Sequence, residues 1–342
     1  MVARLGHGSF AREDEVRQAS FFTRTLTRPK RIGFSKRATL LVKNFGEFME
    51  ADGFDHINEV VWPVLLYRGE RFEALGTAVS VGDGIALTAW HYLTALIPPA
   101  DPPPADGQKV DFQLYVAAFE KARSQILLWP ATRIFAVPWI DIAILYLCGP
   151  DGHTDDFKQR YAHLDFQLPA VGTEVAVMGY RRAEFTNEGM ENGKLRQSFH
   201  PRPTTSLGHI LDVHARSRDA VFLNFPCFLT DAAFDDGMSG GPVFDNTTGR
   251  VIGLVCTSFD QQPGMPPTSY ASLLWPVLGT QVQIRRVDLP EGASYFFHEL
   301  FEKRFLQGTG WEPFSTSTIG DQRSFHLAVS MSKDDARLRR LI

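Results

Sequence analysis

The chain has 342 residues, of which 44% are hydrophobic and 22% are charged, and its 35 Lys and Arg against 39 Asp and Glu leave a net charge of -4. This length is enough for one or two domains with a hydrophobic core, and this composition excludes an intrinsically disordered chain. The weak negative charge gives no general attraction to nucleic acid or to an anionic membrane, and no apolar run reaches the ~18 residues of a membrane span. We therefore expect a soluble globular protein without a membrane span or a nucleic-acid partner.

Residues 1–59 are predicted to form a basic N-terminal extension. Residues 1–43 contain ten basic and three acidic residues, and they lack the continuous apolar segment of an export signal. The acidic run Glu13–Glu15 argues against a transit peptide. A solvated, partly mobile leader is favoured, and a transit peptide or a polyanion-binding arm is the alternative.

The three cysteines bear on the compartment. Cys148, Cys227 and Cys256 are too few and too scattered for a disulfide framework or a cysteine-based metal site. Together with the missing export signal, they indicate a reducing, cytoplasmic location. We expect Cys148 and Cys227 to behave as small buried hydrophobic residues.

Short apolar runs rich in β-formers, separated by turn residues, follow from Val60 onward. They predict two all-β halves, residues 60–150 and 151–284, with a proline-rich loop at Pro98–Gly107 and a polar connection at Gly149–His163. The strands predicted in the first half are Val60–Tyr67, Leu75–Val81, Ile85–Ala89, Asp111–Ala117 and Ile140–Leu147. Those of the second half are Glu174–Gly179, Val221–Asn224, Pro242–Asp245, Val251–Thr257 and Ser269–Leu274, with a hairpin turn at Asn246–Gly249.

Residues 285–342 are predicted to form a helix-containing C-terminal extension. Four large apolar side chains fall on one stripe of a helix predicted over Ser294–Leu306, namely Phe297, Leu300, Phe301 and Phe305. Leaving them in water would be costly, so we expect this helix to be buried against the two halves or against a partner. Ser324–Met331 is predicted as a strand and Asp334–Ile342 as a helical turn.

A serine among glycines carries the first chemical signal. The segment Gly237–Pro242 reads Gly-Met-Ser-Gly-Gly-Pro and precedes a predicted strand. A serine hydroxyl needs a neighbouring base to act as a nucleophile, and its tetrahedral oxyanion needs converging backbone N–H donors. Gly237 permits a tight turn that directs its own N–H and that of Ser239 at one oxygen. Taken alone, the segment would be interpreted as a glycine-rich turn with an incidental serine.

Two upstream residues are suitable partners for this serine. His91 follows a β-run and opens a predicted helical turn, where a general base can be held in place. Asp141 stands at the head of a strongly apolar strand. A carboxylate entering such a strand is costly to bury unless it is paired, and the N–H of an imidazole is a fitting partner. Each of the three residues therefore supplies a chemical partner that another of them needs.

These blocks resemble the trypsin-like (chymotrypsin-fold) serine peptidases, in the chain order His, Asp, Ser. Within that clan the likeness is greatest to the HtrA-type bacterial branch. Gly76–Val79 leading to Thr88–His91 is similar to the family's histidine block, and Asp141–Leu145 to its aspartate block. Thr230–Pro242 and the hairpin containing Gly249–Leu254 are similar to its serine region. The resemblance covers about residues 60 to 282.

The resemblance implies two six-stranded antiparallel β-barrels of the chymotrypsin type, an all-β fold. It implies that Ser239 is the nucleophile, His91 the general base and acid, and Asp141 the carboxylate that orients the imidazole. The oxyanion hole would be formed by the N–H groups of Gly237 and Ser239. A serine endopeptidase that cleaves protein or peptide substrates through an acyl-enzyme is the implied activity, with no cofactor or metal.

Three positions depart from the family pattern. Trp90 replaces the small residue or asparagine usual before the histidine, and Cys256 replaces the Ser or Thr that commonly donates to the catalytic aspartate. A thiol is the weaker donor. Met238 stands where digestive enzymes carry an aspartate that pairs with a newly cut amino terminus, so we expect no such activation. The C-terminal extension is too short for the PDZ module common in the family.

By resemblance, the primary specificity pocket involves four residues with no acid at its base, namely Ala233, Phe234, Thr257 and Ser258. This set favours small or medium apolar side chains in the substrate, unless Asp231 reaches inward. His200, His209 and His214 have no carboxylate or cysteine at ligand spacing and are interpreted as surface histidines.

Two other functions compete with this hypothesis. The segment Gly237–Gly241 also satisfies the G-x-S-x-G elbow of α/β-hydrolases, but that elbow leads into a helix, and its Asp and His follow the serine. The stronger alternative is a catalytically weak or inactive trypsin-like scaffold that acts as a binding or regulatory module. The terminal extensions would then be candidates for binding a regulatory protein.

Overall fold

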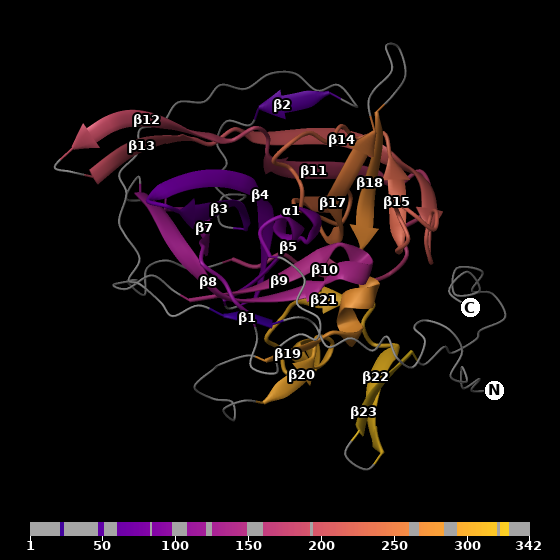
Figure 1. Cartoon of the computed structure of the whole chain (residues 1–342). Helices are drawn as coiled ribbons and strands as arrows, with labels where there is room; N and C mark the ends of the chain where they lie inside the picture. Colours follow the sequence, from indigo (N-terminus) through magenta and orange to yellow (C-terminus); the bar gives the residue numbers. More distant parts are fainter. Residues whose placement is uncertain are drawn as a thin grey trace, which may run out of the picture.

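Strands form most of the regular structure (Figure 1). The computed structural model describes residues 21–23, 47–50, 60–82, 84–97, 108–120, 125–148, 160–191, 194–259, 267–283, 293–319 and 322–327. The two α-helices in this part of the chain, α1 (His91–Thr94) and α2 (Glu299–Glu302), have four residues each. Neither has the length or the apolar character to cross a membrane.

The first half of the chain closes into a six-stranded antiparallel barrel. Its strands are β3 (Val61–Arg68), β4 (Arg71–Gly82), β5 (Ile85–Ala89), β7 (Gln113–Glu120), β8 (Gln125–Val137) and β9 (Ile142–Leu147). They pair around the ring in the order β3-β4-β5-β9-β8-β7, and β7 returns to β3. Bulky apolar residues such as Trp62, Leu114 and Leu145 fill one cluster of this barrel.

The second half repeats this architecture. Its strands are β11 (Glu174–Tyr180), β14 (Pro203–His214), β15 (Cys227–Thr230), β16 (Pro242–Asp245), β17 (Val251–Phe259) and β18 (Thr268–Leu273). The ring runs β16-β11-β14-β15-β18-β17 and closes from β17 to β16. The expected fold class, two six-stranded antiparallel barrels of the chymotrypsin type, is thus confirmed.

Several local predictions were wrong. Val221–Asn224 is not a strand, because the Asp219 carboxylate accepts the N–H groups of the three residues 221–223 and turns the chain there. The strands β8, β14 and β15 and the hairpin of β12 (Glu184–Glu191) with β13 (Lys194–His200) were not predicted. Cys148 is exposed rather than buried. The loop Pro98–Gly107 and most of the connection after Cys148 lie outside the described residues.

Parts of the N-terminal extension belong to the barrels. The strand β1 (Phe21–Thr23) pairs with β8 of the first barrel and with β6 (Gln108–Lys109). The strand β2 (Phe48–Glu50) pairs with β14 of the second barrel. Residues 21–23 and 48–50 therefore extend the sheets of the two barrels.

The C-terminal extension packs where the two barrels meet. In place of the helix predicted over Ser294–Leu306, the chain forms β20 (Ser294–Phe296) and the short α2. The N–H groups of Phe297 and His298 bond to carbonyls of Thr280 and Leu278, beside the 3-10 helix η4 (Trp275–Gly279), which stops a longer helix from forming. Three side chains of the predicted apolar stripe, Phe297, Leu300 and Phe301, are nevertheless buried, and Phe305 is partly buried.

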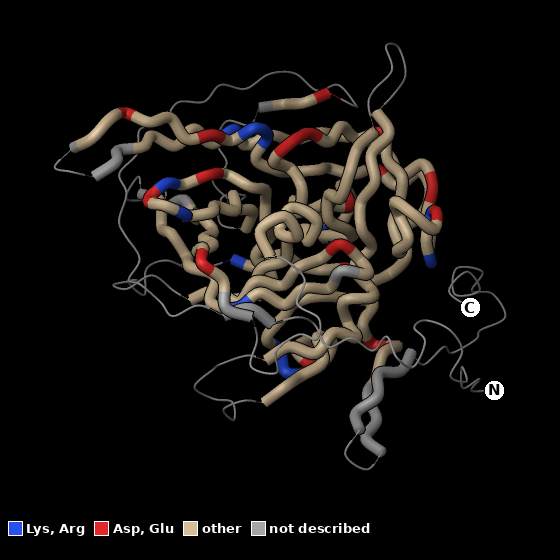
Figure 2. The backbone as a smooth tube through the Cα atoms, in the orientation of Figure 1, with Lys and Arg blue, Asp and Glu red and all other residues tan. Residues whose placement is uncertain are grey.

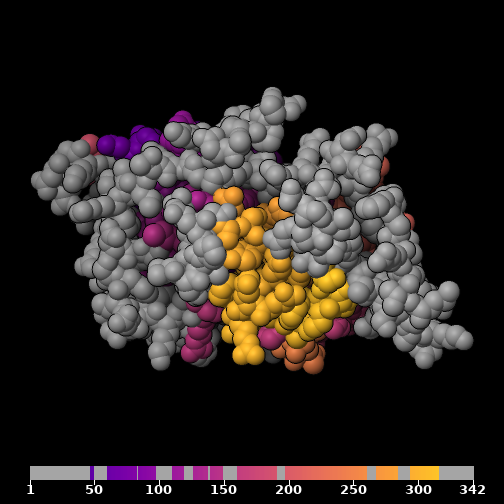
Figure 3. Space-filling model, turned by 90° about the horizontal axis from the view of Figure 1, so that it is seen from below, coloured from indigo at the N-terminus to yellow at the C-terminus, as the bar shows by residue number. Residues whose placement is uncertain are grey.

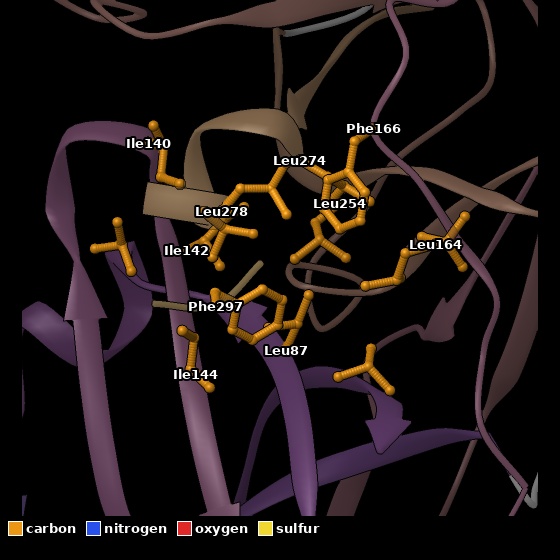
Figure 4. Packing of buried hydrophobic residues seen from close by; sticks show 14 of the residues in the cluster. Leu87, Ile140, Ile142, Ile144, Leu164, Phe166, Leu254, Leu274, Leu278 and Phe297 are labelled. Atoms are coloured by element: carbon orange, nitrogen blue, oxygen red, sulfur yellow. The ribbon is translucent and has the colours of Figure 1, made fainter. Parts of the chain in front are cut away.

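One apolar cluster joins both barrels to this extension (Figure 4). It contains Leu87 and Ile142 of the first barrel, Leu254 of the second and Phe297 of the extension. The remaining short strands are β10 (Leu164–Asp165), β19 (Gln281–Gln283), β21 (Gly308–Thr309), β22 (Phe314–Ile319) and β23 (Gln322–Leu327). The strand β23 pairs with β22 rather than with a barrel edge, and residues 328–342, with the predicted helical turn, lie outside the described part.

Charged residues of both signs are interspersed along the described backbone (Figure 2). They do not segregate into one acidic and one basic half, in keeping with the small net charge. The surface arrangement therefore adds no argument for a polyanionic partner of the described residues.

Candidate active site

His91 and Asp141 are joined by two hydrogen bonds from the histidine. The His91 backbone N–H donates to Asp141 Oδ1 at 2.7 Å, and the His91 ring Nδ1 lies 2.8 Å from Asp141 Oδ2. The Asp141 side chain is 7% exposed, while that of His91 is 43% exposed. A buried carboxylate whose two oxygens both face His91 fixes the imidazole in one orientation and stabilises its protonated form.

Local backbone structure explains why these residues meet. His91 is the first residue of α1, directly after β5 and Trp90. Asp141 follows the 3-10 turn η3 (Pro138–Ile140) and has a left-handed backbone, with φ +53°. The Asp141 carbonyl accepts the Trp90 N–H at 3.1 Å, and β5 pairs with β9 from Ala89↔Ile142 onward. This register places the end of one strand beside the start of the other.

Ser239 approaches the same imidazole from the second barrel. The distance from His91 Nε2 to Ser239 Oγ is 3.0 Å. Since Nδ1 faces a carboxylate, it carries the ring proton of the neutral imidazole, and Nε2 is then the acceptor for the serine hydroxyl. The structure thus brings together the three residues that the sequence proposed as a triad.

Two carbonyls of the Ser239 loop accept backbone hydrogen bonds, one from outside the loop and one from within it. The Asp236 carbonyl accepts from Arg182 N–H at 2.8 Å, and the Met238 carbonyl accepts from Gly241 N–H at 2.8 Å. No described residue accepts a hydrogen bond from the N–H of Gly237 or Ser239. These two amides are therefore available to a substrate oxygen.

Gly237 is required by both backbone angle and space. Its φ is +85°, and an added Cβ would lie 2.4 Å from the Tyr180 carbonyl. Gly240 is equally constrained, because a Cβ there would lie 2.4 Å from Thr77 O and Ala89 N of the first barrel. The glycines of the motif thus allow the loop to lie directly against the first barrel.

Cys256 contacts Asp141 from the second barrel, as its place in the sequence implied. Its side chain lies in a hydrogen bond with the Asp141 carboxylate. Burial and the negative charge of Asp141 raise the pKa of the Cys256 thiol well above its ordinary value. The thiol therefore keeps its proton near neutral pH and acts as a donor to the carboxylate.

Among the described residues, one group of three potential metal ligands lies close together. It consists of His91, Asp141 and Cys256. Its atoms lie within 4.8 Å of one another. Asp141 is engaged by His91 and Cys256, so the hydrogen bonds of the proposed triad already account for this cluster. His209 and His214 lie 3.9 Å and 3.7 Å from the carboxylates of Asp231 and Asp212, and His200 is exposed.

The other two departures from the family pattern are accommodated in the barrels. Trp90 is partly buried and packs against the apolar cluster of the first barrel. Met238 is completely buried in the cluster of the second barrel, and a Cβ on Gly179 would lie 2.8 Å from its Cα. Met238 therefore anchors the Ser239 loop by apolar packing.

The predicted pocket residues fall into two sets. Ala233 and Phe234 are buried in the segment before Ser239, and the Phe234 ring belongs to the apolar cluster of the second barrel. Thr257 and Ser258 lie near the end of β17, where Thr257 is partly buried and Ser258 is exposed. The acid that could have reached inward, Asp231, accepts the His209 N–H at 2.5 Å.

Asp235 is paired with arginines rather than left as an isolated acid. Arg181 Nε lies 2.6 Å and Arg182 Nη2 3.1 Å from Asp235 Oδ2. Burial alone would raise the pKa of the Asp235 carboxyl, but hydrogen bonds from Arg181 and the Asp236 N–H, with both arginine charges, lower it overall. The carboxylate thereby ties the Ser239 loop to the segment after β11.

We predict that this ion pair makes stability depend on pH. The pKa of Asp235 is lower in the folded than in the unfolded protein, where it is ~3.9. Its contribution is therefore complete above that unfolded value and is lost as the pH falls through the lower folded value. Asp235→Asn should lower the melting temperature at pH 7, and the difference from wild type should shrink below about pH 4. An equal difference at every pH would contradict the prediction.

Sequence reasoning missed the residues that support the site. Thr77 and Thr88 are completely buried polar residues of the first barrel, and Tyr92 bonds to Thr88 beside the His91 ring. Tyr180 donates its N–H to Thr77. The one available signal was the pair of threonines on adjacent apolar strands, since buried hydroxyls must find partners.

Two closed antiparallel barrels, with a histidine and an aspartate from the first meeting a serine from the second, define the chymotrypsin-fold class. The chain belongs to the trypsin-like peptidase domain family, whose model matches residues 76–254, just over half of the sequence. Family membership makes it a serine endopeptidase. No curated protein matches the chain.

Solved structures of proteases are similar to this chain at low identity. An inactive form of Rv3671c from M. tuberculosis H37Rv is 16% identical, with 64% of this chain and 83% of that chain covered and a TM-score of 0.39. The MamO protease domain from Magnetospirillum magneticum is 14% identical, with 64% and 94% covered and a TM-score of 0.41. The HtrA-type protease AlgW with a decapeptide is 16% identical, with 63% and 61% covered and a TM-score of 0.41.

Proposed function

We propose that the protein hydrolyses peptide bonds through a triad of His91, Asp141 and Ser239 and an acyl-enzyme intermediate. The observation that carries this proposal is the His91 ring, which stands 2.8 Å from the Asp141 carboxylate and 3.0 Å from the Ser239 hydroxyl. Each ring nitrogen therefore faces the group that its role requires.

In the first half of the reaction, Ser239 Oγ attacks the scissile carbonyl while His91 Nε2 takes the hydroxyl proton. The oxygen of the tetrahedral intermediate is then stabilised by the N–H groups of Gly237 and Ser239. Neither N–H group donates a hydrogen bond to a described residue. The protonated His91 returns the proton to the leaving amine as the C–N bond breaks. Water, deprotonated by the same imidazole, then hydrolyses the acyl ester and regenerates Ser239.

We further propose that small or medium apolar residues precede the scissile bond. The Asp231 carboxylate is fixed in place by the His209 backbone N–H, and Asp235 is paired with two arginines, so neither is free to turn toward a basic substrate residue. Matched peptides with Val, Ala or Leu at that position should be cleaved at least about 10²-fold faster than those with Lys or Arg, because an unpaired desolvated charge costs several kcal/mol. A peptide-library cleavage profile measures this preference. Faster cleavage after Arg would instead indicate Asp231, Asp235 or Asp236 as the pocket acid.

Labelling with a fluorophosphonate tests the activity directly. The reagent should modify Ser239 in the native protein, identified by mass spectrometry of the peptide, and should not modify the Ser239→Ala variant. Prior unfolding of the wild type should abolish the reaction, because only the assembled triad activates the hydroxyl. A natively folded wild type that resists labelling and cleaves no peptide in a library would support the alternative, an inactive scaffold used for binding.

A further inference from the structure

We propose that Thr77 is a positioning residue that holds the oxyanion-hole segment in its active shape. This inference rests on the proposed function, since it assigns a role in the same reaction. Thr77 lies in β4 of the first barrel, whereas the segment that it holds, Gly237–Gly241, belongs to the second barrel.

All polar groups of Thr77 are engaged. Its N–H donates to the Ser239 carbonyl at 2.9 Å, and its hydroxyl donates to the Gly237 carbonyl at 2.8 Å. The hydroxyl oxygen accepts the Tyr180 N–H at 2.9 Å, and the Thr77 carbonyl accepts the Thr88 hydroxyl at 2.6 Å. The residue is 0% exposed, so water cannot replace these partners.

These bonds matter because of how peptide planes are oriented. In a trans peptide the N–H points away from the preceding carbonyl, so fixing a carbonyl also fixes the next amide. The Arg182 N–H fixes the Asp236 carbonyl and with it the N–H of Gly237. The Gly241 N–H fixes the Met238 carbonyl and with it the N–H of Ser239. The plane between those two is held at both of its ends, because the Gly237 carbonyl accepts the Thr77 hydroxyl at 2.8 Å and the Met238 N–H donates to the Asp235 carbonyl at 3.0 Å.

Gly237 is the residue about which this segment can turn. A glycine with φ +85° reaches alternative backbone conformations at little steric cost. Without the Thr77 hydroxyl, the Gly237 carbonyl loses its donor. Its plane then keeps the bond from the Met238 N–H to the Asp235 carbonyl alone, and it can rotate more freely relative to the neighbouring amides. The substrate oxyanion would then meet a hole that is correctly arranged for only part of the time, which lowers the rate of the chemical step more than substrate binding.

The hydrogen bonds of Thr77 also connect the oxyanion-hole segment to a neighbour of the proposed general base. Thr88 bonds both to the Thr77 carbonyl and to the Tyr92 hydroxyl, and the Tyr92 ring meets the His91 ring edge-on with centroids 5.8 Å apart. One buried hydrogen-bond chain thus extends from the oxyanion-hole segment to the neighbour of the histidine. Removing its first hydroxyl is expected to act on the hole, while His91 keeps its own contacts with Asp141 and Ser239.

The test compares Thr77→Val, which removes the hydroxyl at nearly constant shape, with Thr77→Ser, which retains it. Thr77→Val should lower kcat by about 10- to 100-fold with KM within about threefold, and Thr77→Ser should restore kcat to within about threefold of wild type. Thr204→Val is the matched control, because Thr204 is buried and its hydroxyl donates to the carbonyl of Arg202 rather than to the Ser239 loop. Its kcat should remain that of wild type.

A peptide aldehyde separates positioning from general structure. It forms a hemiacetal oxyanion with Ser239, so Thr77→Val should weaken it by the same factor as kcat/KM, while a product peptide of the same sequence binds as before. Each variant is assayed well below its own melting temperature, and Thr77→Ala provides a second hydroxyl-free protein if Thr77→Val does not fold.

Two results would overturn the role of Thr77. One is wild-type kcat in a folded, hydroxyl-free variant, and the other is an equal loss of aldehyde and product affinity without rescue by Thr77→Ser. A wild-type protein that neither reacts with the fluorophosphonate nor cleaves peptides would overturn the proposed function and this inference together. The two failures are therefore distinguishable.

Discussion

Replacement of Ser239 by Ala is expected to abolish peptide-bond cleavage while the protein remains folded. The substitution removes the nucleophile, yet alanine fits a loop whose backbone is held by Thr77, Gly241 and Val255. By analogy with other triads, kcat should fall on the order of 10⁶-fold, with a residual rate of ~10³ to 10⁴ over water from the oxyanion hole and binding. The measurement is the single-turnover hydrolysis of the best library peptide, together with the melting temperature.

His91→Ala should have an equally large effect, because the hydroxyl of Ser239 has no other base within hydrogen-bond distance among the described residues. The double variant should be no slower than either single variant, since triad members act as a unit. Thr94→Ala is a suitable control, because Thr94 lies in the same short helix and its exposed hydroxyl bonds only to the His91 carbonyl. Substantial activity in Ser239→Ala, or additive losses in the double variant, would count against the triad.

Truncation after Arg286 is expected to cost the protein its folded state, although every proposed catalytic residue lies upstream. The removed segment supplies six side chains that are at most 6% exposed, namely Phe296, Phe297, Leu300, Phe301, Leu306 and Phe314. Each such side chain contributes about 1.5 to 3 kcal/mol on burial, so together they match the ~5 to 15 kcal/mol that stabilises a typical domain. Thermal melting and sedimentation should show an unfolded or aggregated product.

Seen from below, the same segment forms part of a continuous orange to yellow patch near the centre of the molecule (Figure 3). Its loss would expose Leu87, Ile142 and Leu254 at the barrel junction. Single substitutions separate buried from exposed positions of this segment. Phe297→Ala should cost about 3 to 5 kcal/mol, whereas Glu312→Ala at an exposed position should be nearly neutral. A truncated monomer with the wild-type melting temperature and cleavage rate would show that the segment serves an outside partner.

The site could be located from the sequence because its signals are local. His91, Asp141 and Ser239 each sit in a short block whose residue types have a chemical reason, and the order of the blocks is sufficient to relate them. The fold class was predictable for the same reason, since strands such as β5 and β16 are short apolar runs bounded by turns. What depends on contacts between distant blocks was not predictable.

Two elements show where this reasoning fails. In β14 the buried face alternates correctly, but its inward residues include Thr204, Ser206 and Gly208, so an apolar period of two is invisible. In Ser294–Leu306 the apolar period matches a helix, yet backbone bonds to the segment around η4 are made instead. The contacts of Thr77 could not be predicted from the sequence for a further reason. They exist only after two separately closed barrels have come together.

The division of the site between the barrels has a kinetic consequence. His91 and Asp141 leave the ribosome well before Ser239. The apolar residues that pack between the two barrels, such as Phe297 and Phe301, are synthesised later still. Strands that are far apart in the sequence pair in this fold, for example β1 with β8 at Phe21 and Phe135. Folds with many such pairings form slowly, in about milliseconds to seconds. A nascent chain that ends between Asp141 and Ser239 therefore holds the proposed base without the proposed nucleophile, and a half-refolded chain holds both in barrels that are not yet in contact. The onset of hydrolysis during refolding should therefore report barrel docking rather than barrel closure, because the proposed triad forms only when the two barrels are in contact.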